Sequence, residues 1–117
     1  MNLKQAFIEN DSIRLGLSAD TWQEAVQLAV QPLIDSGAVT SAYYDAIIAS
    51  TEKYGPYYVL MPGMAMPHAE EGRGVTRNAF ALVTLTKAVT FSAGKEVSFL
   101  LTLAATDPSI HTTVAIP

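Results

Sequence analysis

The chain of 117 residues contains no cysteine. Disulfide bonds, thiolate metal sites and cysteine nucleophiles are therefore excluded, and any covalent chemistry falls to histidine, serine, threonine, lysine or a carboxylate. The uninterrupted apolar stretches are far shorter than the roughly 20 residues that a membrane-spanning helix needs. The first residues also lack a basic segment followed by a long apolar one, as in a signal peptide. We therefore expect a cytoplasmic protein without direct membrane insertion.

Basic residues are scarce, with seven Lys and Arg against eleven Asp and Glu and a net charge of −4. Nucleic-acid binding draws most of its affinity from Lys and Arg that neutralise phosphates, so this balance argues against a nucleic-acid partner. Half of the residues are apolar and only 15% are charged, which excludes a disordered chain. The length suits one domain with a single core.

The hydrophobic pattern changes between the period of a strand and the period of a helix, which is typical of an α/β domain. Residues 13–17 alternate apolar with polar or small side chains and predict a strand. A helical apolar stripe then extends from Trp22 to Leu33, with capping residues before it and Gly37 after it. We expect Pro32 to kink or shorten the last turn of this helix.

The remaining elements follow from the same periodicities. We expect helices over residues 2–9 and 41–53, strands over 57–61, 79–85 and 97–104, and an excursion over 87–95 between the last two strands. In the second long helix, one apolar face is predicted to hold Tyr44, Ile47, Ile48 and Thr51. Residues 64–67 are expected to be extended, and residues 69–78 to form a polar loop.

The only two histidines each stand just past an apolar run. His68 follows residues 61–67, and His111 follows residues 99–105. Ligands of an open α/β sheet gather beyond the carboxyl ends of its strands, so the two histidines meet if both runs end at one edge. A neutral imidazole can act as nucleophile, base, hydrogen-bond partner or metal ligand. The pair is therefore the first candidate for chemistry.

The sequence around each histidine favours a phosphate pocket. Pro67 fixes its own φ and biases Met66 toward extended geometry, so the backbone that leads into His68 is stiff. Asp107 and Pro108 are a helix start signal, which places His111 near a helix N-terminus that favours an anion. One imidazole would attack phosphorus while the other, with backbone N–H groups, would hold the oxygens. Taken singly, each histidine is also consistent with a purely structural role.

Two further possibilities concern a metal and a partner. A metal site would need carboxylates such as Glu70, Glu71 or Asp107, and no spacing typical of paired histidine ligands occurs, so we expect no metal and no cofactor. Met64 and Met66, close to Tyr57, are expected either to fill the core or to form a docking surface for a protein partner.

Residues 55–69, with the sequence GPYYVLMPGMAMPHA, resemble the active-site segment of a known protein family. The family is the enzyme IIA components of the phosphoenolpyruvate-dependent sugar phosphotransferase system, of the mannitol-fructose type. The segments 12–15, 21–26 and 80–85 make the ascorbate-specific branch the nearest resemblance. The similarity extends over essentially the entire chain, which makes it far more specific than the tripeptide of residues 67–69 alone.

The resemblance implies an α/β fold in which helices flank a mixed central sheet. It implies that His68 accepts a phosphoryl group from the carrier HPr and passes it to a cysteine of a IIB domain, and that His111 steadies this group. Residues 1–117 would be a single enzyme IIA domain whose further C-terminal helical part is missing. The alternative is a regulatory domain of the same fold, whose phosphorylation state controls a protein partner.

Two arginines that are common among relatives have no counterpart at the matching places. Residues 50–52 stand where many relatives have an arginine before the active-site strand, and Glu70 stands where some have one after the histidine. Arg73 is the candidate to compensate.

Overall fold

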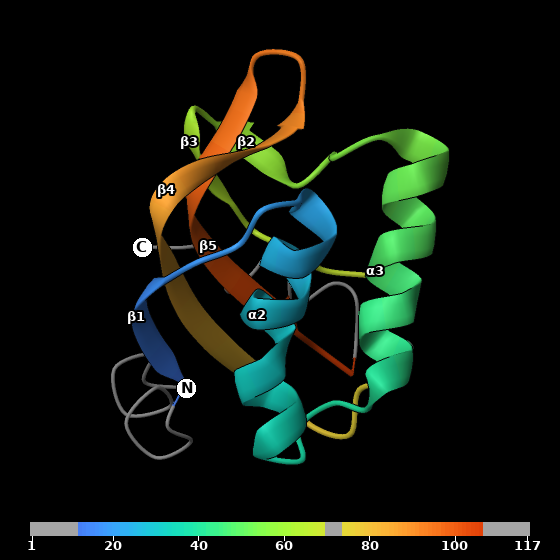
Figure 1. Ribbon diagram of the computed structural model, residues 1–117. Helices are drawn as coiled ribbons and strands as arrows, with labels where there is room; N and C mark the ends of the chain where they lie inside the picture. Colours follow the sequence, from blue (N-terminus) through green and yellow to red (C-terminus); the bar gives the residue numbers. More distant parts are fainter. Residues whose placement is uncertain (1–11, 70–73, 107–117) are drawn as a thin grey trace.

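The computed structural model describes residues 12–69 and 74–106. A five-stranded sheet has the order β1-β4-β5-β3-β2, and the two helices lie on one side of it (Figure 1). In chain order the elements are β1 (Ile13–Leu17), α2 (Trp22–Asp35), α3 (Ser41–Tyr54), β2 (Val59–Met61), β3 (Gly63–Ala65), β4 (Ala79–Ser92) and β5 (Lys95–Ala104). The helix expected over residues 2–9 lies outside the described residues.

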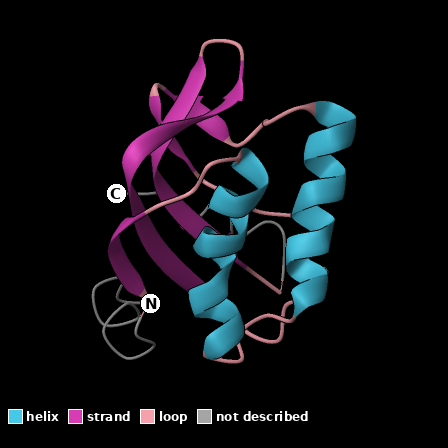
Figure 2. Cartoon of the chain, in the orientation of Figure 1, coloured by secondary structure: helices cyan, strands magenta, loops and turns pink. Residues whose placement is uncertain are grey.

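The sheet is mixed. Strand β1 is parallel to β4 and β3 is parallel to β5, whereas β4 with β5 and β2 with β3 are antiparallel. Helix α2 packs against β4, and α3 lies alongside α2 (Figure 2). The predicted fold class, α/β with helices flanking a mixed central sheet, is confirmed for the described part of the chain.

Helix α2 begins and ends close to the predicted positions. The Thr21 hydroxyl accepts a hydrogen bond from the Glu24 N–H at 3.2 Å, which satisfies one of the free donors of the first turn. The helix continues past Pro32 to Asp35, so of the two expected effects, a kink or a shortened last turn, the shortening is wrong. Proline removes one N–H from the helix but keeps its carbonyl, and the Pro32 oxygen accepts from the Ser36 N–H at 3.1 Å.

Helix α3 has nearly the predicted range, and its buried face shares Ile47 and Thr51 with the predicted one. Its buried side chains are Tyr43, Ile47 and Thr51, while Tyr44 and Ile48 are only partly buried. The spacing of four residues follows one stripe of the helix, and the prediction began that stripe one residue too late. Tyr43 is therefore an interior side chain that the predicted face omits.

Two expectations about the strands are wrong. Residues 87–92 continue β4 instead of forming an excursion, and Val89 pairs with Val97 in a long β4-β5 hairpin. The alternation of buried Val89 and Phe91 with exposed Thr90 is the strand signal that the prediction overlooked. The strand expected over residues 57–61 is shorter, because β2 starts at Val59; as the edge strand of the sheet it exposes two of its three residues.

Alternate side chains of β4 divide between two apolar clusters because successive residues of a strand face opposite sides. Ala79, Ala81 and Val83 join the main core with the buried faces of α2 and α3. Phe80 belongs to a second cluster with Met66, Leu101 and Leu103. The site described below lies at the edge where both clusters end.

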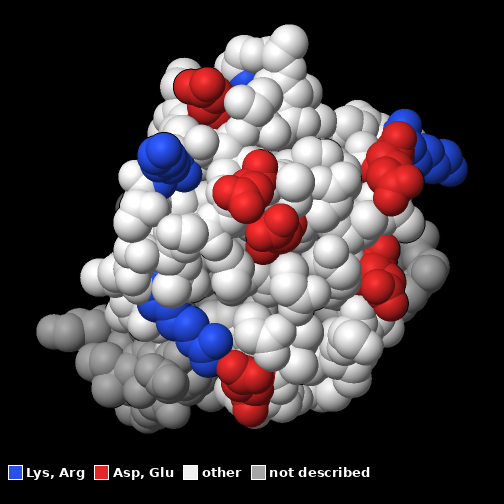
Figure 3. Space-filling model, viewed as in Figure 1, with Lys and Arg blue, Asp and Glu red and all other residues white. Residues whose placement is uncertain are grey.

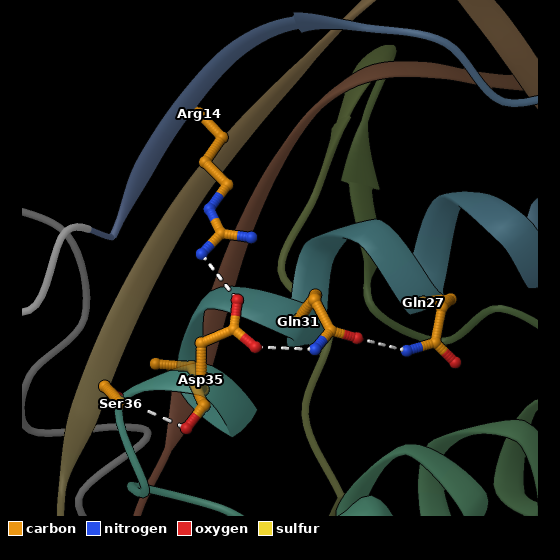
Figure 4. A network of polar contacts seen from close by, with 6 residues as sticks. Arg14, Gln27, Gln31, Asp35 and Ser36 are labelled. Carbon is orange, nitrogen blue, oxygen red and sulfur yellow. Dashed lines mark hydrogen bonds and ion pairs between the residues drawn. The ribbon is translucent and has the colours of Figure 1, made fainter.

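A polar network ties β1 to the end of α2 (Figure 4). The Arg14 guanidinium lies 2.7 Å from the Asp35 carboxylate, which also accepts a hydrogen bond of 2.8 Å from Gln31. Gln27 in turn donates to Gln31 at 2.8 Å. The hydrogen bond from Arg14 lowers the pKa of Asp35 below its ordinary value. Because Arg14 and Asp35 are both partly exposed to solvent, their ion pair contributes little to the stability of the fold.

The charged side chains are scattered over the face that carries the helices, where they form no basic patch (Figure 3). Neither α2 nor α3 is long and apolar enough to cross a membrane.

Candidate functional site

His68 lies at the edge of the sheet where β3 and β5 both end. These strands are parallel neighbours, so their carboxyl ends lie at the same edge. The Leu103 N–H donates to the Pro67 carbonyl at 3.1 Å, which extends the pairing to the residue before the histidine. The predicted placement of His68 beyond a strand end is confirmed. His111, Asp107 and Pro108 lie outside the described residues, as do Glu70, Glu71 and Arg73.

A hydrogen bond to the backbone carbonyl of Met66 orients the imidazole of His68. Nδ1 of His68 lies 2.7 Å from the Met66 carbonyl oxygen. A carbonyl can only accept, so Nδ1 carries a hydrogen and donates it. In the neutral ring the lone pair is then on Nε2. The half-buried side chain is thus held as a single tautomer whose nucleophilic nitrogen is Nε2.

Tyr57 contacts His68 through both its ring and its hydroxyl. The two rings meet edge to face, with centroids 5.3 Å apart and planes inclined by 87°. The Tyr57 hydroxyl donates to the backbone carbonyl of His68. The ring contact limits rotation of the imidazole, and the hydroxyl restrains the backbone that carries it.

Tyr43, on α3, also contacts the backbone next to His68. Its side chain is fully buried, and its hydroxyl donates to the Leu103 carbonyl and accepts from the Ala69 N–H at 3.3 Å. In Figure 1 the yellow-green segment after β3 runs toward α3, in agreement with this contact. Sequence reasoning missed Tyr43, although its spacing of four and eight residues from Ile47 and Thr51 was a usable signal.

Of the two alternatives stated for Met66, the structure supports core filling and contradicts a docking surface. This side chain is only 8% exposed and belongs to the second apolar cluster, so a partner cannot rest on it. Met64 and Tyr57 are partly buried, and the Tyr57 hydroxyl is directed to the His68 carbonyl rather than outward. The exposed apolar side chains of this region include Leu60 and Met61 of β2 and Phe99 of β5, which pairs with Met64.

Among residues 50–52, where the resemblance led us to look for an arginine, Thr51 is an interior hydroxyl. Thr51 is buried, donates to the Ile47 carbonyl at 2.7 Å and lies 2.8 Å from the Tyr58 hydroxyl. Arg77 donates to the Ser36 carbonyl at 3.0 Å. Among the described residues, no group of histidine and carboxylate side chains is arranged to hold a metal ion.

The buried tyrosines predict a loss of stability in alkali. Burial raises the pKa of Tyr58 to about 12 and also raises that of Tyr43. In the unfolded chain both ionise near pH 10. Their stabilising contribution is therefore complete below about pH 10 and is lost as the pH rises through 12, because only the unfolded state releases these protons easily. We expect the tyrosinate absorbance of Tyr43 and Tyr58 to appear together with the loss of near-ultraviolet circular dichroism; ionisation of all tyrosines in a folded chain would contradict this.

Comparison with known proteins identifies the family of the chain. Residues 6–116 match the family model described as "Phosphoenolpyruvate-dependent sugar phosphotransferase system, EIIA 2". The ascorbate-specific PTS system EIIA component of Shigella boydii serotype 4 (strain Sb227) is 44% identical over 118 residues, which cover 99% of this chain and 77% of that protein.

Solved structures show the same fold. A crystal structure described as a candidate PTS IIA domain from Streptococcus pyogenes M1 GAS superposes with a TM-score of 0.95 at 90% identity, covering all of this chain and 76% of that one. The mannitol enzyme IIA of Escherichia coli, in its complex with phosphorylated enzyme IIB, superposes with a TM-score of 0.75 at 26% identity over 89% of this chain and 73% of its own. The family match and the whole-chain identity together show that this chain belongs to the EIIA 2 family of the phosphoenolpyruvate-dependent sugar phosphotransferase system.

Proposed function

We propose that this phosphotransferase component carries its phosphoryl group on Nε2 of His68, taking it from phosphorylated HPr and passing it to a cysteine of a IIB partner. The hydrogen bond from Nδ1 of His68 to the Met66 carbonyl carries this proposal. In the neutral imidazole this bond leaves the lone pair on Nε2. A nucleophile with one tautomer and one orientation is what a phosphoryl relay needs, because such transfers depend on positioning.

The proposed steps are balanced displacements at phosphorus. The Nε2 lone pair forms a bond to the phosphorus of the donor, while the bond from phosphorus to the donor nitrogen breaks and its electron pair returns to that nitrogen. In the second step a IIB thiolate attacks phosphorus, and the electron pair of the broken bond returns to Nε2. In both steps Nδ1 keeps its hydrogen and its hydrogen bond to the Met66 carbonyl.

The remaining assignments rest on the resemblance and the comparisons. We infer that His111 steadies the phosphoryl oxygens and that the helix start at Asp107 and Pro108 adds backbone N–H donors. The named function of the Shigella relative supports ascorbate as the transported compound. The mannitol complex supports a IIB domain as the acceptor. A relay of this kind works in the cytoplasm, where we place residues 1–117 as a single enzyme IIA domain.

Reconstitution of the relay tests the proposal. The chain is incubated with phosphoenolpyruvate, enzyme I and HPr, and its intact mass is measured before and after addition of an ascorbate IIB domain. We expect one phosphoryl group that is stable in base and labile in acid, and its transfer to IIB. No uptake from phosphorylated HPr, or a label stable in acid, would overturn the proposal. A mannitol IIB domain is the control for the acceptor, and equal transfer to it would overturn the ascorbate assignment.

A further inference from the structure

The peptide group that joins His68 to Ala69 is bound at both ends by tyrosine hydroxyls. Its carbonyl oxygen accepts from Tyr57, and its N–H donates to Tyr43. The two tyrosines come from different parts of the fold, since Tyr43 lies on α3 and Tyr57 precedes β2. A single peptide plane directly after the proposed nucleophile is therefore restrained from two directions.

We propose that Tyr43 and Tyr57 are positioning residues, which hold this peptide plane and thereby fix the direction in which His68 presents Nε2. The proposal rests on the proposed function, because it assumes that the imidazole must meet a phosphoryl donor in one orientation. It adds two residues outside the chemistry itself, whose hydroxyls act on the backbone and not on the phosphoryl group.

The position of His68 in the fold explains why side chains are needed for this purpose. The last backbone pairing between β3 and β5 is the bond from the Leu103 N–H to the Pro67 carbonyl. The next peptide group along the chain, between His68 and Ala69, is bound by the two hydroxyls in place of a neighbouring strand. Backbone polar groups in a buried place need partners, and Ala69 is buried. The two tyrosine hydroxyls thus take the place of strand pairing for one more residue, at the peptide group next to the His68 side chain.

Each hydroxyl has a defined direction of donation. The Tyr57 hydrogen is given to the His68 carbonyl. The Tyr43 hydrogen is given to the Leu103 carbonyl, so its oxygen is available to accept from the Ala69 N–H. Tyr43 therefore links the end of β5 to the residue after His68. Burial favours its neutral form, which is the form that can donate.

The backbone on the other side of the imidazole is fixed as well. The Met66 N–H donates to the Tyr58 carbonyl at 2.9 Å, and the Met66 carbonyl accepts from Nδ1 of His68. With the far side held by Tyr43 and Tyr57, the ring is attached to a frame that is restrained both before and after it. An error of about 1 Å in the position of a reacting group can cost about 100-fold in rate, so this restraint bears directly on transfer.

The test compares three hydroxyl deletions, Tyr43→Phe, Tyr57→Phe and Tyr58→Phe. Tyr58 is the matched control, because its buried hydroxyl contacts Thr51, and phenylalanine keeps the backbone carbonyl that accepts from the Met66 N–H. We expect kcat for phosphoryl uptake from phosphorylated HPr to fall about tenfold in Tyr43→Phe and Tyr57→Phe, with KM for HPr nearly unchanged. In Tyr58→Phe we expect wild-type kcat with a lower melting temperature.

Nitrogen-15 chemical shifts of His68 supply a second measurement that needs no phosphoryl donor. We expect the wild type and Tyr58→Phe to show the tautomer with hydrogen on Nδ1, and Tyr43→Phe and Tyr57→Phe to show averaging between tautomers. If Tyr43→Phe does not fold, Tyr57→Phe alone decides, because that side chain is only partly buried. Wild-type kcat and wild-type shifts in Tyr57→Phe would overturn the positioning role. Absence of uptake by the wild type would instead overturn the proposed function, and the shifts would still report on the positioning.

Discussion

Replacing His68 with alanine is expected to abolish phosphorylation by phosphorylated HPr. The variant lacks the lone pair that Nε2 provides, and the only other imidazole of the chain belongs to His111. No described side chain offers a substitute, because the two tyrosines nearest the site use their hydroxyls to bind backbone groups. Intact mass measurement after incubation with the relay proteins checks the result.

The loss should be chemical and not structural. The His68 side chain is half-buried, and Tyr57 binds its backbone carbonyl, which alanine retains. We therefore expect a loss of about 1 kcal/mol or less in the free energy of unfolding. His111→Ala serves as the contrast, with retained labelling at a reduced rate. Full labelling of a folded His68→Ala chain would show that the phosphoryl group is carried elsewhere.

The sequence alone predicts that His68 lies beyond the end of β3. It does not predict which side chains contact the backbone next to this histidine. The stiff approach through Pro67 and the apolar run before it place His68 at a strand end by local rules alone. Tyr43 lies 25 positions earlier in the chain, and its role depends on how α3 packs beside the sheet. Local periodicity marks Tyr43 as buried at best, because the partners of a buried hydroxyl are set by tertiary packing.

The hairpin of β4 and β5 was also predicted only in part from the sequence. The apolar runs at 79–85 and 97–104 predict two central strands correctly. Thr86, Lys87 and Ala88 are all exposed and break the alternation between Leu85 and Val89, so the local pattern indicates an end to the strand. Pairing with β5 nevertheless carries β4 to Ser92. Cross-strand pairing between distant residues overrides a short polar interruption of this kind.

Gly74→Ala is expected to be the most destabilising single-methyl change near the site. Gly74 has a φ of +80°, and a Cβ there would lie 2.7 Å from the backbone nitrogen of Tyr43 and 2.8 Å from Oγ1 of Thr40. The Gly74 carbonyl also accepts from the Thr40 N–H at 2.8 Å, so the loop rests directly on the start of α3. The methyl group can be accommodated only if the loop and the helix separate.

Two costs combine in this variant. A left-handed backbone at a residue other than glycine costs about 1–2 kcal/mol, and forcing an extra carbon into a packed contact costs about 1–3 kcal/mol. Gly37→Ala is the matched control, because Gly37 has the same φ of +80° with nothing within 4 Å of the added carbon. In urea denaturation we expect Gly37→Ala to lose only the first of these contributions. Equal losses in the two variants would show that the contact with α3 is unimportant.

The same substitution connects the loop to the site. The nitrogen that the added methyl would press against belongs to Tyr43, the residue whose hydroxyl binds the Ala69 N–H. A shift of the first turn of α3 would therefore move that hydroxyl relative to the peptide after His68. We expect folded Gly74→Ala protein to show a reduced kcat for phosphoryl uptake, as in Tyr43→Phe, while folded Gly37→Ala keeps the wild-type value. The close contact at Gly74 would then serve to seat Tyr43 as well as to close the loop.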